Sequence, residues 1–209
     1  MDFVAARKVM VDSQVRVNDV TDRGLQAALL AVPRERFCAP DRAFSAYAEV
    51  DVEITGERHL MQAREVSKLL MAAEPRVGER ALAIAAPYAA AVLAQLGLTV
   101  TAQESDAGVF GVVGGALADA GVETVTAGLN TPAGGDWDLI VSEAASPVRP
   151  QAWLDALRVG GRAVLVERTG PVGKAVLYVR GQNGLSRREL FDATPPVLAE
   201  MIPVPTFAL

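Results

Sequence analysis

The apolar residues in the first third of the chain recur with helical spacing. They form two amphipathic stretches on either side of a polar junction at 18–23, where Thr21 or Asp22 is a suitable N-cap for the second helix. Pro33 is expected to end that helix, because proline cannot continue the backbone hydrogen bonding. The apolar positions of the two stretches are Val9, Val11, Val15, Val17, Leu25, Ala28, Leu29 and Val32.

A loop is expected between Pro33 and Pro40, and the aromatic residues that follow it are candidate core anchors. Residues 47–54 alternate apolar and acidic side chains, which is the period of a half-buried strand. Residues 62–73 return to helical spacing. The expected anchors are Phe37, Phe44 and Tyr47, with Cys38 as a small buried residue beside them.

From Arg80 onward, short apolar strands alternate with helical stretches, which is typical of a parallel sheet with helices on both faces. Strands are expected at 81–85, 98–102, 124–127, 138–142 and 162–167, and helices at 88–96, 107–120 and 151–158. Segments 175–180 and 199–207 are expected to pair as antiparallel strands at the sheet edge. The pattern predicts one α/β domain over 1–209, with a helical N-terminal extension and a loop on the substrate side at 1–78 and the sheet core at 79–209.

Composition narrows the class of protein. The chain has 209 residues, of which 51% are hydrophobic and 22% charged, as in a globular protein with one core. Its net charge of −5 argues against nucleic-acid binding, and no apolar run is long enough to span a membrane. The N-terminus lacks the pattern of a signal peptide, and the single cysteine cannot form an internal disulfide. A cytoplasmic protein is expected.

The first strand of the sheet core leads into an unusual turn. Nucleotide-binding α/β folds commonly place a glycine-rich loop here, because backbone N–H groups must approach the cofactor closely. In this chain the segment 83–88 reads Ala-Ile-Ala-Ala-Pro-Tyr and contains no glycine. Ala85 and Ala86 carry a Cβ atom and Pro87 has no N–H to donate, so the turn is expected to be compact and to fill the space of a cofactor.

Other polar residues have both a functional and a structural interpretation. Arg58 and His59 lie in a Gly-Glu-Arg-His turn that is either a substrate loop meeting a carboxylate or, as we favour, a polar surface turn. His59 has no Cys or His partner at metal-binding spacing, so no metal is expected. Ser142 and Glu143 lie where the fourth strand ends, but without a histidine they do not form a nucleophile system.

Several motifs in this order resemble the protein-L-isoaspartate O-methyltransferase family. The most distinctive is Val-Pro-Arg-Glu-Arg-Phe at 32–37, followed by Pro40 and the Ala46-Tyr47 pair, because it is not part of the generic methyltransferase fold. Further matches are Met10-Val11 with Gln14, Asp-Arg-Gly-Leu at 22–25, Tyr88 with 90–94, Trp-Asp-Leu-Ile-Val at 137–141, and Leu-Arg-Val-Gly-Gly-Arg at 157–162.

The resemblance implies a Rossmann-like, seven-strand class I methyltransferase sheet. It further implies methyl transfer from S-adenosylmethionine to isoaspartyl carboxylates of a protein or peptide. By position, the cofactor-binding candidates are Ala85, Tyr88, Glu104 and Gly128. Glu104 follows the second strand, where the family's acid bonds the ribose hydroxyls; equally, it is a solvated acid at a helix N-terminus.

The chain also departs from the family pattern at three motifs. The loop "E-I-G-T-G-S-G-Y" is two residues shorter here and has lost every glycine, the "G-Q-T-I-S" segment has no Thr or Ser at 56–61, and "G-D-G" has no Asp at 127–129. These losses predict weak cofactor binding and slow or absent methylation. The alternative is a non-catalytic binding or assembly module. Separately, the apolar residues of the N-terminal extension, Phe3, Val4, Val9 and Val11, are expected to pack on the domain or on a second copy in a homodimer. A NAD-dependent enzyme is disfavoured because no G-x-G-x-x-G follows the first strand.

Overall fold

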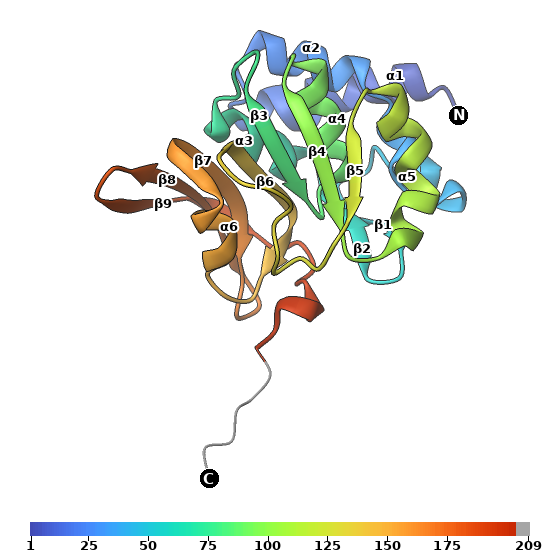
Figure 1. Ribbon diagram of the computed structural model, residues 1–209. Coiled ribbons are helices and arrows are strands. Elements are labelled where there is room, and N and C mark those ends of the chain that lie inside the picture. The colour runs from blue at the N-terminus through green and yellow to red at the C-terminus, as the bar shows by residue number, and fades with distance from the viewer. Residues whose placement is uncertain (204–209) are drawn as a thin grey trace.

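A computed structural model describes residues 1–203, and its centre is one seven-stranded sheet (Figure 1). The strands are β3 (Arg80–Ile84), β4 (Thr99–Glu104), β5 (Glu123–Thr126), β6 (Trp137–Ser146), β7 (Leu157–Glu167), β8 (Gly173–Gly181) and β9 (Gly184–Ala193). Their order across the sheet is β5-β4-β3-β6-β7-β8-β9. The first five strands in this order are parallel, whereas β8 and β9 continue the sheet as an antiparallel hairpin. The predicted seven-strand sheet is confirmed.

The helices follow the predicted alternation, with small shifts at their ends. Asp22 caps α2, since its carboxylate accepts the N–H of Leu25 at 2.6 Å. The helices are α1 (Phe3–Met10), α2 (Arg23–Ala31), α3 (Ala63–Ala73), α4 (Pro87–Gln95), α5 (Ala107–Asp119) and α6 (Gln151–Asp155). Short helical turns are η1 (Val11–Val15), η2 (Arg16–Asn18), η3 (Arg34–Arg36), η4 (Pro40–Ser45) and η5 (Ala199–Met201).

The sheet separates two hydrophobic clusters. In β3 the side chains alternate, so that Ala81 and Ala83 face the cluster beneath the N-terminal helices, α3, α4 and α5. Leu82 and Ile84 face the opposite cluster, to which α6 contributes Trp153. Because both faces are covered, the β3 side chains from Ala81 to Ile84 are all apolar and buried, as expected for a central parallel strand.

The N-terminal extension packs on the sheet domain through Met10, Val11 and Val15, all of which are buried. Val4 and Val9 stay exposed, so contact with a second copy of the chain remains a prediction. Within residues 1–203, no helix has the length and apolar character needed to cross a membrane.

Two expectations for residues 37–54 need correction. Phe37 and Cys38 are buried as predicted, but the side chain of Phe44 is 61% exposed and anchors nothing. The alternating segment forms only a short strand, β1 (Val52–Thr55), which pairs with β2 (Arg58–Leu60) in a hairpin separate from the main sheet. Period-two alternation shows that one face is buried, but not which strand is the partner.

The antiparallel edge is also built differently from the prediction. β8 pairs with β9, whereas Ala199–Met201 is a 3-10 turn and residues 204–207 lie outside the described residues. Most side chains of β9 are polar and exposed, as is common in a strand at the edge of a sheet. Its sequence therefore lacks the apolar pattern that predicts a strand and resembles that of a loop. The Asn-Gly pair at 183–184 is a hairpin signal that could have located it.

Gly161 in β7 is expected to tolerate no side chain. A Cβ atom there would lie 2.6 Å from the carbonyl oxygen of Trp137 and 2.8 Å from that of Arg158. Gly161→Ala should therefore destabilise the fold by about 2–3 kcal/mol. The control is Gly111→Ala in α5, which meets no atom within 4 Å and should stabilise by up to about 1 kcal/mol. Urea unfolding of the two variants measures both effects, and equal stabilities would contradict this packing.

Candidate functional site

Buried polar side chains gather where β4 and β6 end, at the carboxyl edge of the sheet. Gln103 and Glu104 end β4, and Ser142 and Glu143 lie in the second half of β6; each is at most 1% exposed. Open parallel sheets bind their ligands at this edge. The site is therefore in the expected place; sequence analysis singled out Glu104, Ser142 and Glu143 there and missed Gln103.

The turn from β3 into α4 is closed. Ala85 has φ of +49°, a left-handed conformation that costs a non-glycine residue about 1–2 kcal/mol. Its N–H donates to the carbonyl of Gln103 at 3.0 Å, and both Ala85 and Ala86 are buried, with Pro87 starting α4. The backbone thus keeps a glycine-like turn while its methyl groups fill the surrounding space.

Glu143 occupies the N-terminus of α4. Its Oε1 accepts the N–H of Ala89 at 2.6 Å, which satisfies one of the donors that a helix leaves free at its start. Burial raises the pKa of Glu143 to about 7, although the N–H of Ala89 opposes the shift. The carboxylate of Glu143 therefore occupies the position at the N-terminus of α4 at which a helix can bind an anionic ligand.

Arg34 and Tyr88 complete this buried cluster. Arg34 is fully buried; its Nε donates to the carbonyl of Ala46 at 2.7 Å, its Nη2 donates to that of Met61, and its guanidinium lies 4.8 Å from the centre of the Tyr88 ring. Tyr88 lies in the core, and its hydroxyl has no hydrogen-bond partner among residues 1–203. The distinctive segment at 32–37 thus joins the N-terminal part of the chain to the sheet edge.

Glu104 is paired inside the protein. Arg58 of β2 donates from Nε to Glu104 Oε2 at 2.9 Å and from Nη2 to Glu200 Oε1, also at 2.9 Å. The second oxygen of Glu104, Oε1, is buried and has no partner in the described part of the chain. Burial raises the pKa of Glu104 to about 7 despite the opposing guanidinium of Arg58.

Arg58 was therefore misjudged as part of a polar surface turn, since it is only 8% exposed. The hairpin brings it to Glu104, 46 residues away, and local sequence carries no signal of such a contact. His59 is partly exposed and its Nδ1 lies 3.0 Å from the carbonyl oxygen of Glu57. The structure thus brings Arg58 to the site and leaves His59 outside it.

Gln103, which sequence analysis missed, fixes the loop that follows β5. Its amide donates to the carbonyls of Gly128 and Thr131 at 2.9 and 3.0 Å and accepts the N–H of Ala133 at 2.8 Å. Gly128 is exposed and contributes its carbonyl to this network. A glutamine near the carboxyl end of a predicted strand, directly before Glu104, is the signal that could have found it.

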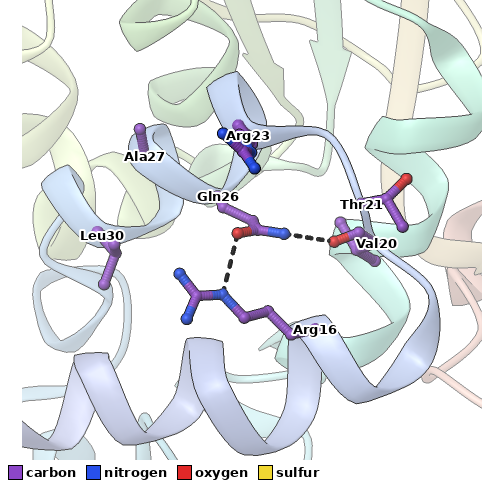
Figure 2. Close-up of a pocket in the computed structure, with 7 residues that line it drawn as sticks. All are labelled: Arg16, Val20, Thr21, Arg23, Gln26, Ala27 and Leu30. Atoms are coloured by element: carbon purple, nitrogen blue, oxygen red, sulfur yellow. Dashed lines mark hydrogen bonds between the residues drawn. The ribbon is translucent and has the colours of Figure 1, made fainter.

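A separate hollow of about 630 Å³ lies over the N-terminal helices, between η2 and α2 (Figure 2). Arg16 donates to Gln26 Oε1 at 3.0 Å, and Gln26 donates to the carbonyl of Val20 at 2.7 Å. Arg16 and Gln26 are therefore engaged within the protein. The hollow is the poorer candidate, because it is lined by the N-terminal helices and their connecting turn alone, whereas open parallel sheets bind their ligands at the carboxyl edge.

Curated relatives extend over most of the chain. It is 34% identical to protein-L-isoaspartate O-methyltransferase 1 of Rhodopseudomonas palustris (strain HaA2) over 178 residues, 82% of this chain and 71% of the relative. It is 31% identical to the protein-L-isoaspartate O-methyltransferase of Methylorubrum extorquens (strain PA1) over 201 residues, 93% of this chain and 87% of the relative. The chain belongs to the protein-L-isoaspartate O-methyltransferase family. A scan against protein-family models finds no match.

Solved structures of the family share this fold. A protein-L-isoaspartate O-methyltransferase superposes with a TM-score of 0.77 at 16% identity and covers 94% of this chain and 67% of its own. A putative family member from Plasmodium falciparum, in complex with S-adenosyl-L-homocysteine, has a TM-score of 0.79 at 14% identity and covers 93% and 98%. The fold is that of a class I methyltransferase with N-terminal helices.

The carboxylates at the carboxyl edge are engaged within the protein in the arrangement described. A carboxylate needs accessible oxygens to bind a ribose diol, and Glu104 has one oxygen paired with Arg58 and the other sealed in the protein. The methyl groups of Ala85 and Ala86 fill the approach to the backbone, and Glu143 occupies the start of α4.

The buried Glu143 makes stability depend on pH. Its folded pKa of about 7 exceeds its ordinary value of 4.5, so between these values the folded state binds more protons and stability should fall as the pH rises. The native protein should melt at a lower temperature at pH 8 than at pH 6. Glu143→Gln should flatten that slope by up to about 1.4 kcal/mol per pH unit. Exposed Glu123→Gln is the control and should leave the slope unchanged; a native slope retained in Glu143→Gln would contradict the assignment.

The strained turn gives a second expectation. Replacing a buried alanine by glycine removes a buried methyl group and increases the conformational entropy of the unfolded chain. Together these effects should lower the free energy of unfolding by about 1.5–2 kcal/mol. At Ala85, release of the left-handed strain should offset this cost, so Ala85→Gly should be nearly neutral. Ala83→Gly, two residues earlier and equally buried, is the matched control and should show the full loss in urea unfolding. Equal losses at both positions would rule out strain at Ala85.

Proposed function

We propose that this chain is a protein carboxyl methyltransferase that uses S-adenosylmethionine and methylates isoaspartyl carboxylates slowly. The names of its curated relatives support the reaction and the protein substrate. The Plasmodium falciparum neighbour bound to S-adenosyl-L-homocysteine, the product left after methyl transfer, supports the cofactor. The observation that supports slow turnover is the buried pairing of Glu104 with Arg58.

The chemistry makes cofactor binding the decisive requirement. Transfer of a methyl group from a sulfonium to a carboxylate is a substitution by a nucleophile that is already charged. The enzyme therefore has mainly to hold donor and acceptor in line at close distance. When the binding-competent arrangement is a minor fraction of the protein, the apparent affinity for the cofactor falls by that fraction. A site whose acid is paired internally is expected to lower the rate in this way.

A non-catalytic binding or assembly module is the second candidate, and the Ala85 turn favours it. Opening a site by side-chain movement costs less than rebuilding a buried turn that lacks glycine and whose helix starts with Pro87. If the turn alone excludes the nucleoside, the family fold is retained for another role. The two candidates differ in whether any methyl transfer occurs.

Methyl transfer to an isoaspartyl peptide tests the proposal. With labelled S-adenosylmethionine, we expect turnover at least tenfold slower than that of a family member with the glycine-rich loop, yet above background. Glu104→Ala should raise the KM for the cofactor severalfold, because the carboxylate that would hold the ribose is removed.

Three outcomes separate the alternatives. Turnover within tenfold of the positive control would contradict a closed site. Equal background signal from the native chain and Glu104→Ala, with both folded by circular dichroism, would support the non-catalytic module. A native rate above background with an unchanged KM in Glu104→Ala would remove Glu104 from the cofactor site.

A further inference from the structure

The contact between Arg58 and Glu104 joins segments that are far apart in the sequence. Arg58 lies in the β1–β2 hairpin, Glu104 ends the central strand β4, and Glu200 lies in η5 near the end of the described chain. One guanidinium bridges both carboxylates at 2.9 Å, and its Nη2 also lies 3.4 Å from the hydroxyl oxygen of Ser105. The hairpin and η5 are thereby tied together over the carboxyl edge of the sheet.

The two ends of this bridge differ in their exposure to water. The side chains of Glu104 and Arg58 are 1% and 9% exposed, whereas that of Glu200 is 38% exposed. A surface ion pair contributes little, whereas a buried carboxylate that loses its partner costs several kcal/mol. Glu104 therefore requires a cation or hydrogen-bond donor at this position, and Arg58 supplies it while Glu200 holds Arg58 from the outside.

A ligand hydroxyl and the Arg58 guanidinium compete for the same oxygen. The Nε atom lies 2.9 Å from Oε2, and the Glu104 side chain beneath it is only 1% exposed, so a hydroxyl reaches Oε2 only when Arg58 moves aside. A hollow of about 360 Å³ adjoins the guanidinium and is lined by Thr55, Glu57, Arg58, Ser105, Asp106, Val109, Ala199 and Glu200. This hollow can receive the displaced side chain, and Glu57 and Asp106 can pair with its charge there.

We propose that Arg58 is a gate residue, which controls access of the cofactor's nucleoside to Glu104 by exchanging between that carboxylate and the adjoining hollow. The proposal rests on the proposed function, because it assigns to Arg58 the fraction of protein that is competent to bind cofactor. Its direct consequence is that removal of the guanidinium raises affinity for a nucleoside ligand, whereas removal of an ordinary structural arginine lowers affinity or leaves it unchanged.

Calorimetric titration with S-adenosyl-L-homocysteine tests the gate. Arg58→Gln, which keeps an amide donor for Glu104, should bind at least tenfold more tightly than the native chain. Glu200→Gln, which keeps the Arg58–Glu104 pair, should bind more tightly than native but less tightly than Arg58→Gln. Arg187→Ala is the control, because this arginine lies in β9 and pairs with Glu167 of β7 and Glu189 of β9, and its loss should leave affinity unchanged.

Folding of every variant is checked by circular dichroism and urea unfolding. Folded Arg58→Gln with no gain over native would overturn the gate while leaving the proposed slow turnover intact. If Arg58→Gln fails to fold, Glu200→Gln decides alone, and an affinity equal to native overturns the gate. Tight binding by the native chain, together with turnover close to the positive control, would instead overturn the proposed function.

Discussion

Two carboxylates buried at the carboxyl edge of the sheet constrain the elements around them. Glu104 ends β4 and Glu143 lies in the second half of β6, the two strands that flank β3, and burial disfavours the charged form of each. Each has a hydrogen-bond donor from a distant segment. Arg58 of the β1–β2 hairpin donates to Glu104, and the N–H of Ala89 in the first turn of α4 donates to Glu143. The hairpin, the C-terminal turn and the start of α4 are thus positioned by the requirement to compensate buried charge.

The same compensation accounts for the closed edge. In a ligand-binding sheet, helix N-termini and strand-end acids remain available to the ligand. Here both kinds of group are engaged by the protein, and the Ala85 turn adds methyl groups where backbone would be exposed. The chain therefore keeps the family fold with Glu104 and Glu143 engaged within the protein. In the proposed function, a ligand that binds Glu104 supplies the free energy that separates it from Arg58.

The N-terminal motif has a structural explanation in this arrangement. Arg34 donates to the carbonyls of Ala46 and Met61, while Glu35 pairs with Arg7 at 3.1 Å and accepts the Tyr47 hydroxyl. These bonds fix the segment between the N-terminal helices and the sheet. Residues that identify the family in the sequence are thus the ones that hold its N-terminal part in place.

The sequence by itself determined the alternation of strands and helices, the single sheet and the family, because these depend on local period and ordered motifs. It also located Glu104 and the altered turn at Ala85, since both follow directly after predicted strands. It failed for β9, whose exposed edge carries little apolar pattern, and for Phe44. It also missed Gln103, although a polar side chain within a buried strand is a readable signal.

Only the tertiary structure decided what Glu104 and Glu143 contact. Arg58 lies 46 residues from Glu104, and Ala89 lies 54 residues from Glu143. The local sequence around a charged residue does not show whether its side chain is solvated on a surface turn or paired in the interior. Burial is created by the packing of segments that are distant in the sequence. The chemical identity of the site was therefore set by sequence, and its accessibility by the fold.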